Sequence, residues 1–168
     1  SAASAHAGHE HSREIQIVEV SGLLDPIEID YINLQLDNAQ RNWALAIVLQ
    51  INSPGGAADQ QLIQDLIENI EGSLVPVGAW IGQSGATAKG AAAYLVNAAD
   101  YSGIAPGSRI GNFEDFEKSA EPGITEIKNT LRRGEEAVTA GLVDVMAPTL
   151  GEFLLAMEDV GLIEKIST

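Results

Sequence analysis

Apolar residues along the chain follow two different patterns. In residues 25–42 and again from Ala57 to Glu71 they recur at helical spacing. Between these stretches, residues 44–51 form a nearly continuous apolar run, which is typical of a strand covered on both faces. The pattern therefore predicts two amphipathic helices with a buried strand between them. The inward-facing helix positions are Ile29, Ile32, Leu36, Ala39, Leu62, Ile63, Leu66, Ile67 and Ile70.

Strands and helices are predicted to alternate along the rest of the first two thirds of the chain. Residues 13–20 alternate in the manner of a strand near a sheet edge, and residues 75–80 form a second short buried strand. A glycine-bracketed turn and an alanine-rich helix are expected over residues 82–99. Residues 101–111 have the pattern of a strand interrupted by a Pro-Gly turn. This alternation predicts an α/β fold with a mostly parallel sheet and helices packed outside.

The last third departs from that alternation before returning to it. Residues 112–126 contain five acids and a Pro-Gly pair, which predicts a solvated acidic loop. A short helix is expected after Gly134 and a strand at residues 142–146. Thr149, with Glu152 three residues later, has the spacing of a capping box, so a further helix is expected to begin there.

The length of 168 residues suits one domain with a substantial core. We expect this domain to occupy residues 14–168, preceded by a flexible leader at residues 1–13. The leader is small and polar and lacks an apolar segment, as in the region that follows a removed signal peptide. No stretch of the sequence approaches the length of a membrane span.

Composition narrows the classes of partner and of chemistry. The chain has 24 acidic and 9 basic residues and a net charge of −15, so nucleic acids and anionic lipid surfaces are poor partners. The absence of cysteine excludes disulfides, thiolate metal sites and cysteine nucleophiles. His6, His9 and His11 lie close together in the leader and suit weak metal binding, although a polar linker explains them more simply. We therefore expect no metal and no cofactor.

Two loops are predicted to meet at one edge of the sheet. The segment "NSPGG" (52–56) leaves the strand ending near Ile51, and "GQSGATAKGA" (82–91) leaves the strand ending near Trp80. Loops at the carboxyl ends of parallel strands share an edge, and ligands bind there. Each loop alone is more simply a strand exit, but the pair favours a site. The cleft residues expected from these loops are Ser53, Pro54, Gly85, Thr87 and Lys89.

Backbone N–H groups at this edge are expected to bind an anion. Gly55 and Gly56 lack a β-carbon and allow close approach, and the predicted helix start at residues 86–91 offers unpaired N–H groups that include Ala91. Together they would form an oxyanion hole, which in acyl-transfer enzymes contributes about 2.7–4 kcal/mol per donor.

Three segments carry a resemblance to a known family: "IVLQINSPGGAADQQLIQDLI", "VPVGAWIGQSGATAKGAAAYLVNAADYSGIAPGSRIG" and "GEEAVTAGLVDVMAPTLGEFL". In their order and spacing, over about residues 14 to 160, they resemble the N-terminal protease-class domain of NfeD-type membrane proteins, within the ClpP and crotonase superfamily. The resemblance implies a ClpP/crotonase-type fold, homo-oligomers, and a location on the extracytoplasmic face of the cell membrane. It also implies a membrane attachment through a C-terminal region that this chain lacks. Active members use a serine nucleophile and a lysine base to cleave hydrophobic segments of membrane-associated partners such as stomatin-like proteins.

The same resemblance points to a missing nucleophile. When "GATAKGAAAYL" is laid beside the active tract, Gly85 matches its first glycine, Thr87 its non-catalytic serine and Tyr94 its aromatic residue. Gly90 then falls on the nucleophilic serine. Because glycine has no side chain, the atom that the family's chemistry requires is expected to be absent.

The base is also not evident. Active relatives carry the catalytic lysine on a long helix after a segment like "PGSRIG", and Lys118 and Lys128 are the lysines of that interval here. Lys118 lies among acids that stabilise its charged form, so solvated surface lysines explain both residues better than a neutral base does. No histidine replaces them, since all three histidines lie in the leader.

Other residues offer weaker routes to a nucleophile. Ser84 in "GQSGA" is similar to the elbow motif G-x-S-x-G, but that elbow needs a histidine and an acid, and a serine capping the following helix is simpler. Thr87 is expected one helical turn before Gly90 and receives little weight, because threonine nucleophiles rely on their own terminal amine. Lys89 either extends to solvent or places a cation at the cleft mouth.

The sequence thus favours a degenerate protease-like domain that acts as a binding or assembly module of a membrane protein, with a peptide or a membrane-associated protein segment as its partner. The alternative is an active serine endopeptidase of the Ser/Lys type with Ser84 as nucleophile. An acyl-CoA site of the crotonase type lacks an evident basic cluster for the phosphates. An apolar stripe on a helix predicted at residues 149–163 suits either an oligomer interface or the core.

Overall fold

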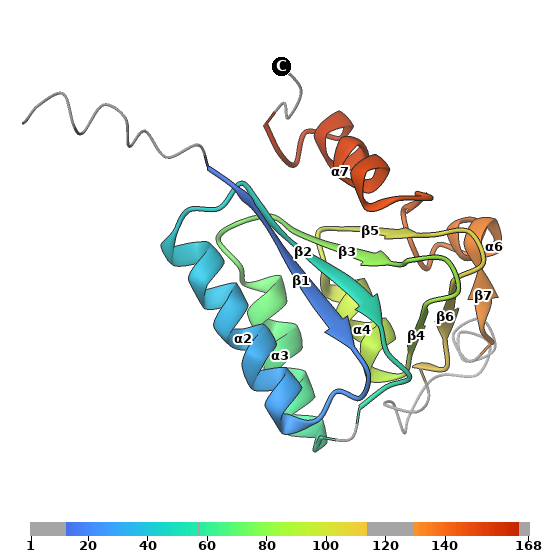
Figure 1. Cartoon of the computed structure of the whole chain (residues 1–168). Helices are drawn as coiled ribbons and strands as arrows, with labels where there is room; N and C mark the ends of the chain where they lie inside the picture. The colour runs from blue at the N-terminus through green and yellow to red at the C-terminus, as the bar shows by residue number, and fades with distance from the viewer. Residues whose placement is uncertain (1–12, 57, 114–129, 165–168) are drawn as a thin grey trace, which may run out of the picture.

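A computed structural model describes residues 13–56, 58–113 and 130–164 of the chain. Its elements alternate along most of the chain between strands and helices, as Figure 1 shows. In chain order they are β1 (Ile15–Ser21), α2 (Pro26–Arg41), β2 (Ala46–Asn52), α3 (Gln60–Glu71), β3 (Val77–Ile81), β4 (Thr87–Lys89), α4 (Ala91–Ala98), β5 (Tyr101–Ile104), β6 (Arg109–Gly111), β7 (Arg132–Arg133), α6 (Gly134–Thr139), β8 (Val145–Met146) and α7 (Leu150–Asp159).

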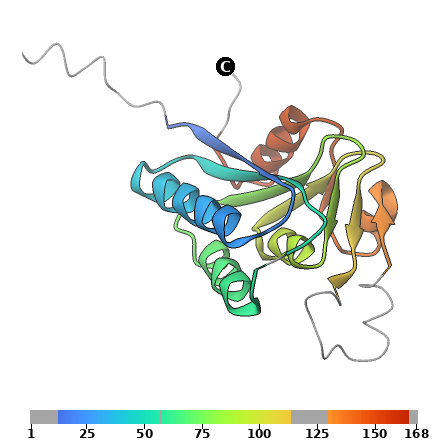
Figure 2. The ribbon, with the colours of Figure 1, turned by 60° about the horizontal axis from the view of Figure 1, so that its bottom comes forward.

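A five-stranded sheet forms the centre of the fold, with strand order β1-β2-β3-β5-β8 and all neighbours parallel. Helices α2, α3 and α4 lie on one side of it and α7 on the other (Figures 1 and 2). A second, three-stranded sheet of order β4-β6-β7 lies beside the carboxyl ends of these strands. The predicted α/β class with a mostly parallel sheet is confirmed.

The first helices form where the apolar spacing predicts them. In α2 the four predicted inward positions, Ile29, Ile32, Leu36 and Ala39, are all buried. The Asp25 side chain accepts the Glu28 N–H at 2.8 Å, which satisfies a free donor at the helix start. In α3 Asp59 caps the start in the same way and Gly72 ends the helix. Four of the predicted α3 positions are buried, whereas Leu62 remains 36% exposed.

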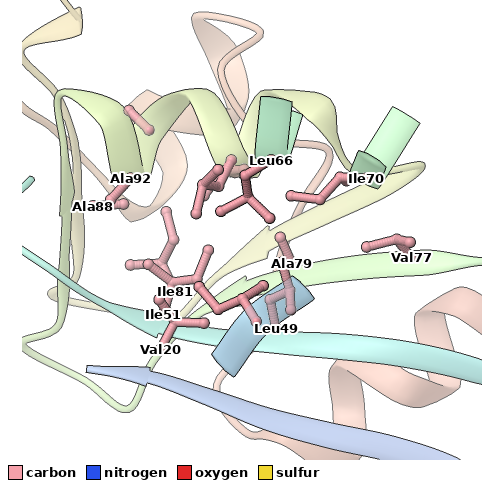
Figure 3. Packing of buried hydrophobic residues seen from close by; sticks show 14 of the residues in the cluster. Val20, Leu49, Ile51, Leu66, Ile70, Val77, Ala79, Ile81, Ala88 and Ala92 are labelled. Atoms are coloured by element: carbon pink, nitrogen blue, oxygen red, sulfur yellow. The ribbon is translucent and has the colours of Figure 1, made fainter. Parts of the chain in front are cut away.

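Two apolar clusters hold the layers together. The larger cluster lies between the central sheet and α2, α3 and α4. In Figure 3, Leu66 and Ile70 extend from α3 toward Leu49 and Ala79 of the sheet. The smaller cluster lies on the other face of the sheet, under α7. Because the sheet is covered on both faces, the central strands β2 and β3 are almost entirely buried, as their continuous apolar runs predict.

Helix α7 packs closely on the sheet because two strand positions lack side chains. A β-carbon placed on Gly103 would lie 2.6 Å from a ring carbon of Phe153, and one on Gly78 would lie 2.6 Å from the Met157 sulfur. Phe153 and Met157 are fully buried there. The Trp80 indole N–H in the same layer donates to the Ala147 carbonyl at 2.9 Å. The two glycines therefore set the distance at which α7 sits.

One predicted helix is wrong at its beginning. The sequence predicts a helix after the turn at residues 82–85, with free N–H groups from residue 86 onward, but residues 87–89 form strand β4 and α4 begins only at Ala91. The physical reason is strand pairing: β4 pairs in parallel with β6 and bridges to Ser53. The stretch from Ala86 to Lys89 also alternates buried and half-buried residues, which is the period of a strand.

Three further boundaries differ from prediction. The segment 101–111 is not one interrupted strand, because β5 and β6 belong to different sheets. The strand expected at residues 142–146 is limited to β8. The last helix ends at Asp159, although it begins as predicted with Thr149, whose hydroxyl accepts the Glu152 N–H at 3.1 Å. The apolar stripe predicted on this helix contributes partly to the core and partly to the exposed surface, where it could form an oligomer interface. Phe153 and Met157 are buried, Leu154 and Leu162 are partly buried, and Leu155 and Val160 are exposed.

Several predictions fall outside the described residues. They concern most of the leader with its histidines, most of the acidic loop at residues 112–126, and the candidate bases Lys118 and Lys128. Within the part of the chain that is described, no helix has both the length and the apolar character needed to cross a membrane.

The close packing of α7 makes a stability prediction. In Gly103→Ala the new methyl group meets the buried Phe153 ring, and we expect overpacking to lower the free energy of unfolding by about 1–3 kcal/mol. Gly151→Ala is the matched control, because its methyl group has ordinary contacts and α7 gains a better helix former. Urea unfolding followed by circular dichroism measures both. Equal stability of the Gly103 and Gly151 variants would contradict this packing.

Candidate functional site

The two loops predicted to meet are joined by backbone hydrogen bonds. The Ser53 N–H donates to the Thr87 carbonyl at 2.6 Å, and the Lys89 N–H donates to the Ser53 carbonyl at 3.1 Å. Ser53 and Ala88 form a parallel bridge. The chain leaving β2 therefore extends the small sheet by pairing with β4. This pairing fixes the "SPGG" turn against the segment that leads into α4.

Gly90 connects β4 to α4 through an unusual backbone conformation. It is the residue that precedes the helix, with φ 55° and ψ −122°. Its N–H donates to the Gly111 carbonyl at 3.1 Å, and its carbonyl accepts the Tyr94 N–H at 3.2 Å. The positive φ is strained for residues with a side chain and free of that strain for glycine. A sharp strand-to-helix turn of this kind is where α/β-hydrolases place a nucleophilic serine.

The "SPGG" turn lies directly against this junction. Gly55 has φ 124°, and a β-carbon placed on it would lie 3.4 Å from the Lys89 carbonyl oxygen. A β-carbon on Gly56 would lie 2.7 Å from the Ile63 δ-carbon and 3.3 Å from the Ala91 β-carbon. The absence of side chains at both glycines thus allows the turn to approach the start of α4.

The N–H donors at this junction are not equivalent. The Gly55 N–H donates to the hydroxyl of Ser53 at 3.2 Å, and Ser53 itself is fully buried. For the N–H groups of Gly56 and Ala91, no acceptor is found among the residues that the structure describes. The sequence analysis predicted that the N–H groups of Gly55, Gly56 and Ala91 would all be free to bind an anion. The structure instead leaves Gly56 and Ala91 as available donors and engages Gly55 in its own turn.

Ser84 lies in a different place from Gly90. It is exposed, in the turn between β3 and β4, and it lines a depression with Glu19, Ser21, Gln50 and Asn52 at the ends of β1 and β2. No lysine or histidine lines that depression in the described part of the chain. The simpler role proposed for Ser84, capping the following helix, is wrong, because β4 follows the turn and α4 begins seven residues later at Ala91.

The remaining predicted cleft residues are either half-buried on β4 or exposed on the two turns. Thr87 and Lys89 are half-buried and lie on the same side of β4, opposite the buried Ala88. The Thr87 N–H donates to the side-chain oxygen of Asn52 at 3.1 Å. Thr87 is therefore a strand residue and does not lie one helical turn before Gly90. Pro54 and Gly85 are exposed on the two turns.

Sequence reasoning did not identify Gly111, whose carbonyl holds the Gly90 N–H. The sequence offered one indication of this role, the glycine that closes "PGSRIG". The structure shows why a glycine stands there, because a β-carbon at Gly111 would lie 2.4 Å from the Thr130 carbonyl oxygen. The buried Phe113, two residues later, packs edge-on against Tyr94 of α4 with ring centroids 5.0 Å apart. The chain leaving β6 thus also packs against the first turn of α4.

Residues that would act as bases or metal ligands are not gathered at this junction in the described part of the chain. Lys89 is the lysine adjacent to Gly90, and its side chain lies on the half-buried face of β4. No group of three His, Cys, Asp or Glu residues suited to a metal ion occurs among the described residues. The arrangement that remains is a backbone cradle beside a glycine.

Comparison with characterised proteins shows similarity to a membrane-bound protease. No family model matches the chain. The membrane-bound protease PH1510 of Pyrococcus horikoshii is 26% identical over 97 residues. The aligned part covers 58% of this chain and 22% of that protease, so the chain spans less than a quarter of its relative's length.

Solved structures show the shared fold. A lysine-to-alanine variant of the 1510-N membrane-bound stomatin-specific protease, in complex with a substrate peptide, has a TM-score of 0.73 and 21% identity, with 85% of this chain and 79% of that chain covered. An enoyl-CoA hydratase from Thermoplasma volcanium has a TM-score of 0.72 and 16% identity, with 87% and 73% covered. The predicted ClpP/crotonase-type fold and the likeness to a membrane-bound protease are confirmed.

The engagement of Gly55 by Ser53 predicts a local effect of substitution. Ser53→Ala removes the buried acceptor of the Gly55 N–H, so we expect faster hydrogen exchange at that amide and a loss of about 1–3 kcal/mol in the free energy of unfolding. Ser73→Ala is the control, because Ser73 accepts the Val75 N–H at 3.3 Å in the same kind of turn. Its effect should stay near Val75. Unchanged exchange at Gly55 in the Ser53 variant would show that this hydrogen bond does not hold the turn.

Proposed function

We propose that this domain binds extended peptide segments at the junction of the "SPGG" turn and α4 and does not cleave them. The observation that carries the proposal is Gly90 at the strand-to-helix turn, with φ 55°. Acyl transfer by this kind of site needs a nucleophilic side chain at that turn and a base beside it. Glycine supplies neither.

The backbone features that bind a peptide carbonyl do not depend on that nucleophile. The N–H groups of Gly56 and Ala91 have no acceptor among the described residues, and Ala91 is the first residue of α4. The positive end of the helix dipole adds to their attraction for a carbonyl oxygen. The β-carbon contact that Gly56 would make with Ala91 places the two donors on neighbouring backbone. A peptide carbonyl that approaches them would be held without being attacked.

The alternative function, a serine endopeptidase with Ser84 as nucleophile, has less support. Ser84 is exposed, and the depression that it lines includes Glu19, Gln50 and Asn52 but neither Gly56 nor Ala91. A peptide carbonyl attacked by a hydroxyl at this place would not lie beside the N–H donors of Gly56 and Ala91. A Ser/Lys mechanism also needs a lysine within hydrogen-bond reach, and the depression has none among the described residues.

The partner is proposed from the relatives. One structural neighbour is a stomatin-specific protease with a bound substrate peptide, and a sequence relative is a membrane-bound protease. We infer that the present domain binds a segment of a membrane-associated, stomatin-like protein and serves in the assembly of a complex at the extracytoplasmic face of the membrane. Homo-oligomerisation belongs to the same proposal. The exposed Leu155 of α7 and Val160, which directly follows α7, offer apolar area for it.

Nuclear magnetic resonance combined with mass spectrometry tests binding without cleavage. An apolar, unstructured peptide added to isotope-labelled protein should shift the amide signals of Gly56, Gly90 and Ala91 and leave those around Ser84 unchanged. The peptide should be recovered intact after prolonged incubation. A polar peptide of equal length is the control for non-specific binding. Cleavage that disappears in Ser84→Ala, or shifts centred on Ser84, would favour the endopeptidase instead.

A further inference from the structure

Positively charged side chains gather on the small sheet next to Gly90. The described residues contain six Lys and Arg side chains, on a chain whose net charge is −15. Four of them belong to the β4-β6-β7 sheet. A concentration of this kind on an acidic protein creates a local field opposite to that of the remaining surface. The six are Arg13, Arg41, Lys89, Arg109, Arg132 and Arg133.

Strand register places three of these cations on one face. Thr87 of β4 is paired with Arg109 of β6, and Arg109 is paired with Arg133 of β7. Side chains of directly paired residues lie on the same face of a sheet, and Lys89 follows Thr87 by two residues onto that face. The opposite face carries Ala88 and Ile110, which are fully buried in the core. The face of Lys89, Arg109 and Arg133 is the outer one, and we call it the basic face.

The charges of the basic face are not neutralised within the described part of the chain. The ion pairs found there are Arg13 with Glu164 and Arg41 with Asp37, and neither involves a residue of the small sheet. Glu135 and Glu136 at the start of α6 share a depression with Arg132, whose side chain belongs to the opposite face. Like charges directly opposed on neighbouring strands, such as Arg109 and Arg133, are destabilising without an anion between them.

The basic face adjoins the proposed peptide site. Lys89 directly precedes Gly90, and its carbonyl oxygen lies against Gly55. Neighbouring strands lie about 4.8 Å apart, so Arg133 is within about 10 Å of β4, a distance that three extended residues cross. A peptide held at the start of α4 would thus bring its flanking residues over the three cations.

We propose that the basic face selects acidic residues that flank the peptide segment bound at Gly90. The inference rests on the proposed function and adds a charge preference to it. Arginine presents a planar fork that matches a carboxylate, and two arginines side by side suit clustered Asp or Glu side chains or a terminal carboxylate. A nucleic acid or an anionic membrane fits less well, because either would bring its charge over the acidic remainder of the surface.

Fluorescence anisotropy with two labelled peptides tests the preference on the full chain. Both peptides share one apolar centre, and one is flanked by three glutamates on each side and the other by three glutamines. At low ionic strength the glutamate peptide should bind about three- to tenfold more tightly, as expected for a few exposed ion pairs, and added salt should remove the difference. The double variant Arg109→Gln/Arg133→Gln should also remove it, whereas the control Arg13→Gln/Arg41→Gln, with the same change in net charge, should keep it.

The outcomes separate this inference from the function on which it rests. If both peptides bind equally to the unmodified chain, the charge preference is wrong and peptide binding stands. If neither peptide binds, the proposed function is wrong and the preference falls with it. If the control variant loses the preference as well, overall charge and not the basic face is responsible. The single variant Arg133→Glu, at an exposed position, lowers the charge of the basic face by as much as the double variant and should likewise remove the difference between the two affinities, and an undiminished preference there would also overturn the inference.

Discussion

The backbone turn at Gly90 is the constraint on which the site depends. A strand must end and a helix must begin within one residue, and the positive φ of that residue satisfies both without side-chain strain because it is a glycine. Hydrogen bonds hold the turn from two directions, through Gly111 on one side and through the pairing of Ser53 with β4 on the other. The "SPGG" turn, the start of α4 and the basic face all take their positions from this junction.

The proposed function requires that a protease-like fold be kept without its chemistry, and the same junction allows this. The features that would hold a peptide carbonyl are backbone N–H groups, and these survive any change of side chain. The nucleophile that we propose to be missing would be a single side chain, and a glycine in its place relaxes the turn at that residue. Loss of catalysis therefore need not disturb the fold or the donors of Gly56 and Ala91. On this account selectivity would come from neighbouring side chains such as Arg109 and Arg133.

The sequence predicts the layers of this fold better than it predicts the site. Strong apolar spacing identified α2, α3 and the buried strand between them, because burial on a regular element leaves a regular pattern. It failed at residues 86–90, where alanines suggested a helix and long-range pairing with Ser53 and β6 produced a strand. The engagement of the Gly55 N–H by Ser53 and the role of Gly111 are likewise tertiary contacts without a local pattern. The opposition of Arg109 and Arg133 follows only from strand register.

Labelling with a fluorophosphonate, followed by intact-mass and peptide-level mass spectrometry, tests the central claim most directly. The reagent forms a covalent adduct with a serine that is activated in an assembled site, and an active serine protease treated in parallel controls for its potency. The account predicts that this chain stays unmodified, because Gly90 offers no oxygen and Ser84 has no base beside it among the described residues. A stoichiometric adduct on Ser84, or on any other serine, would contradict it.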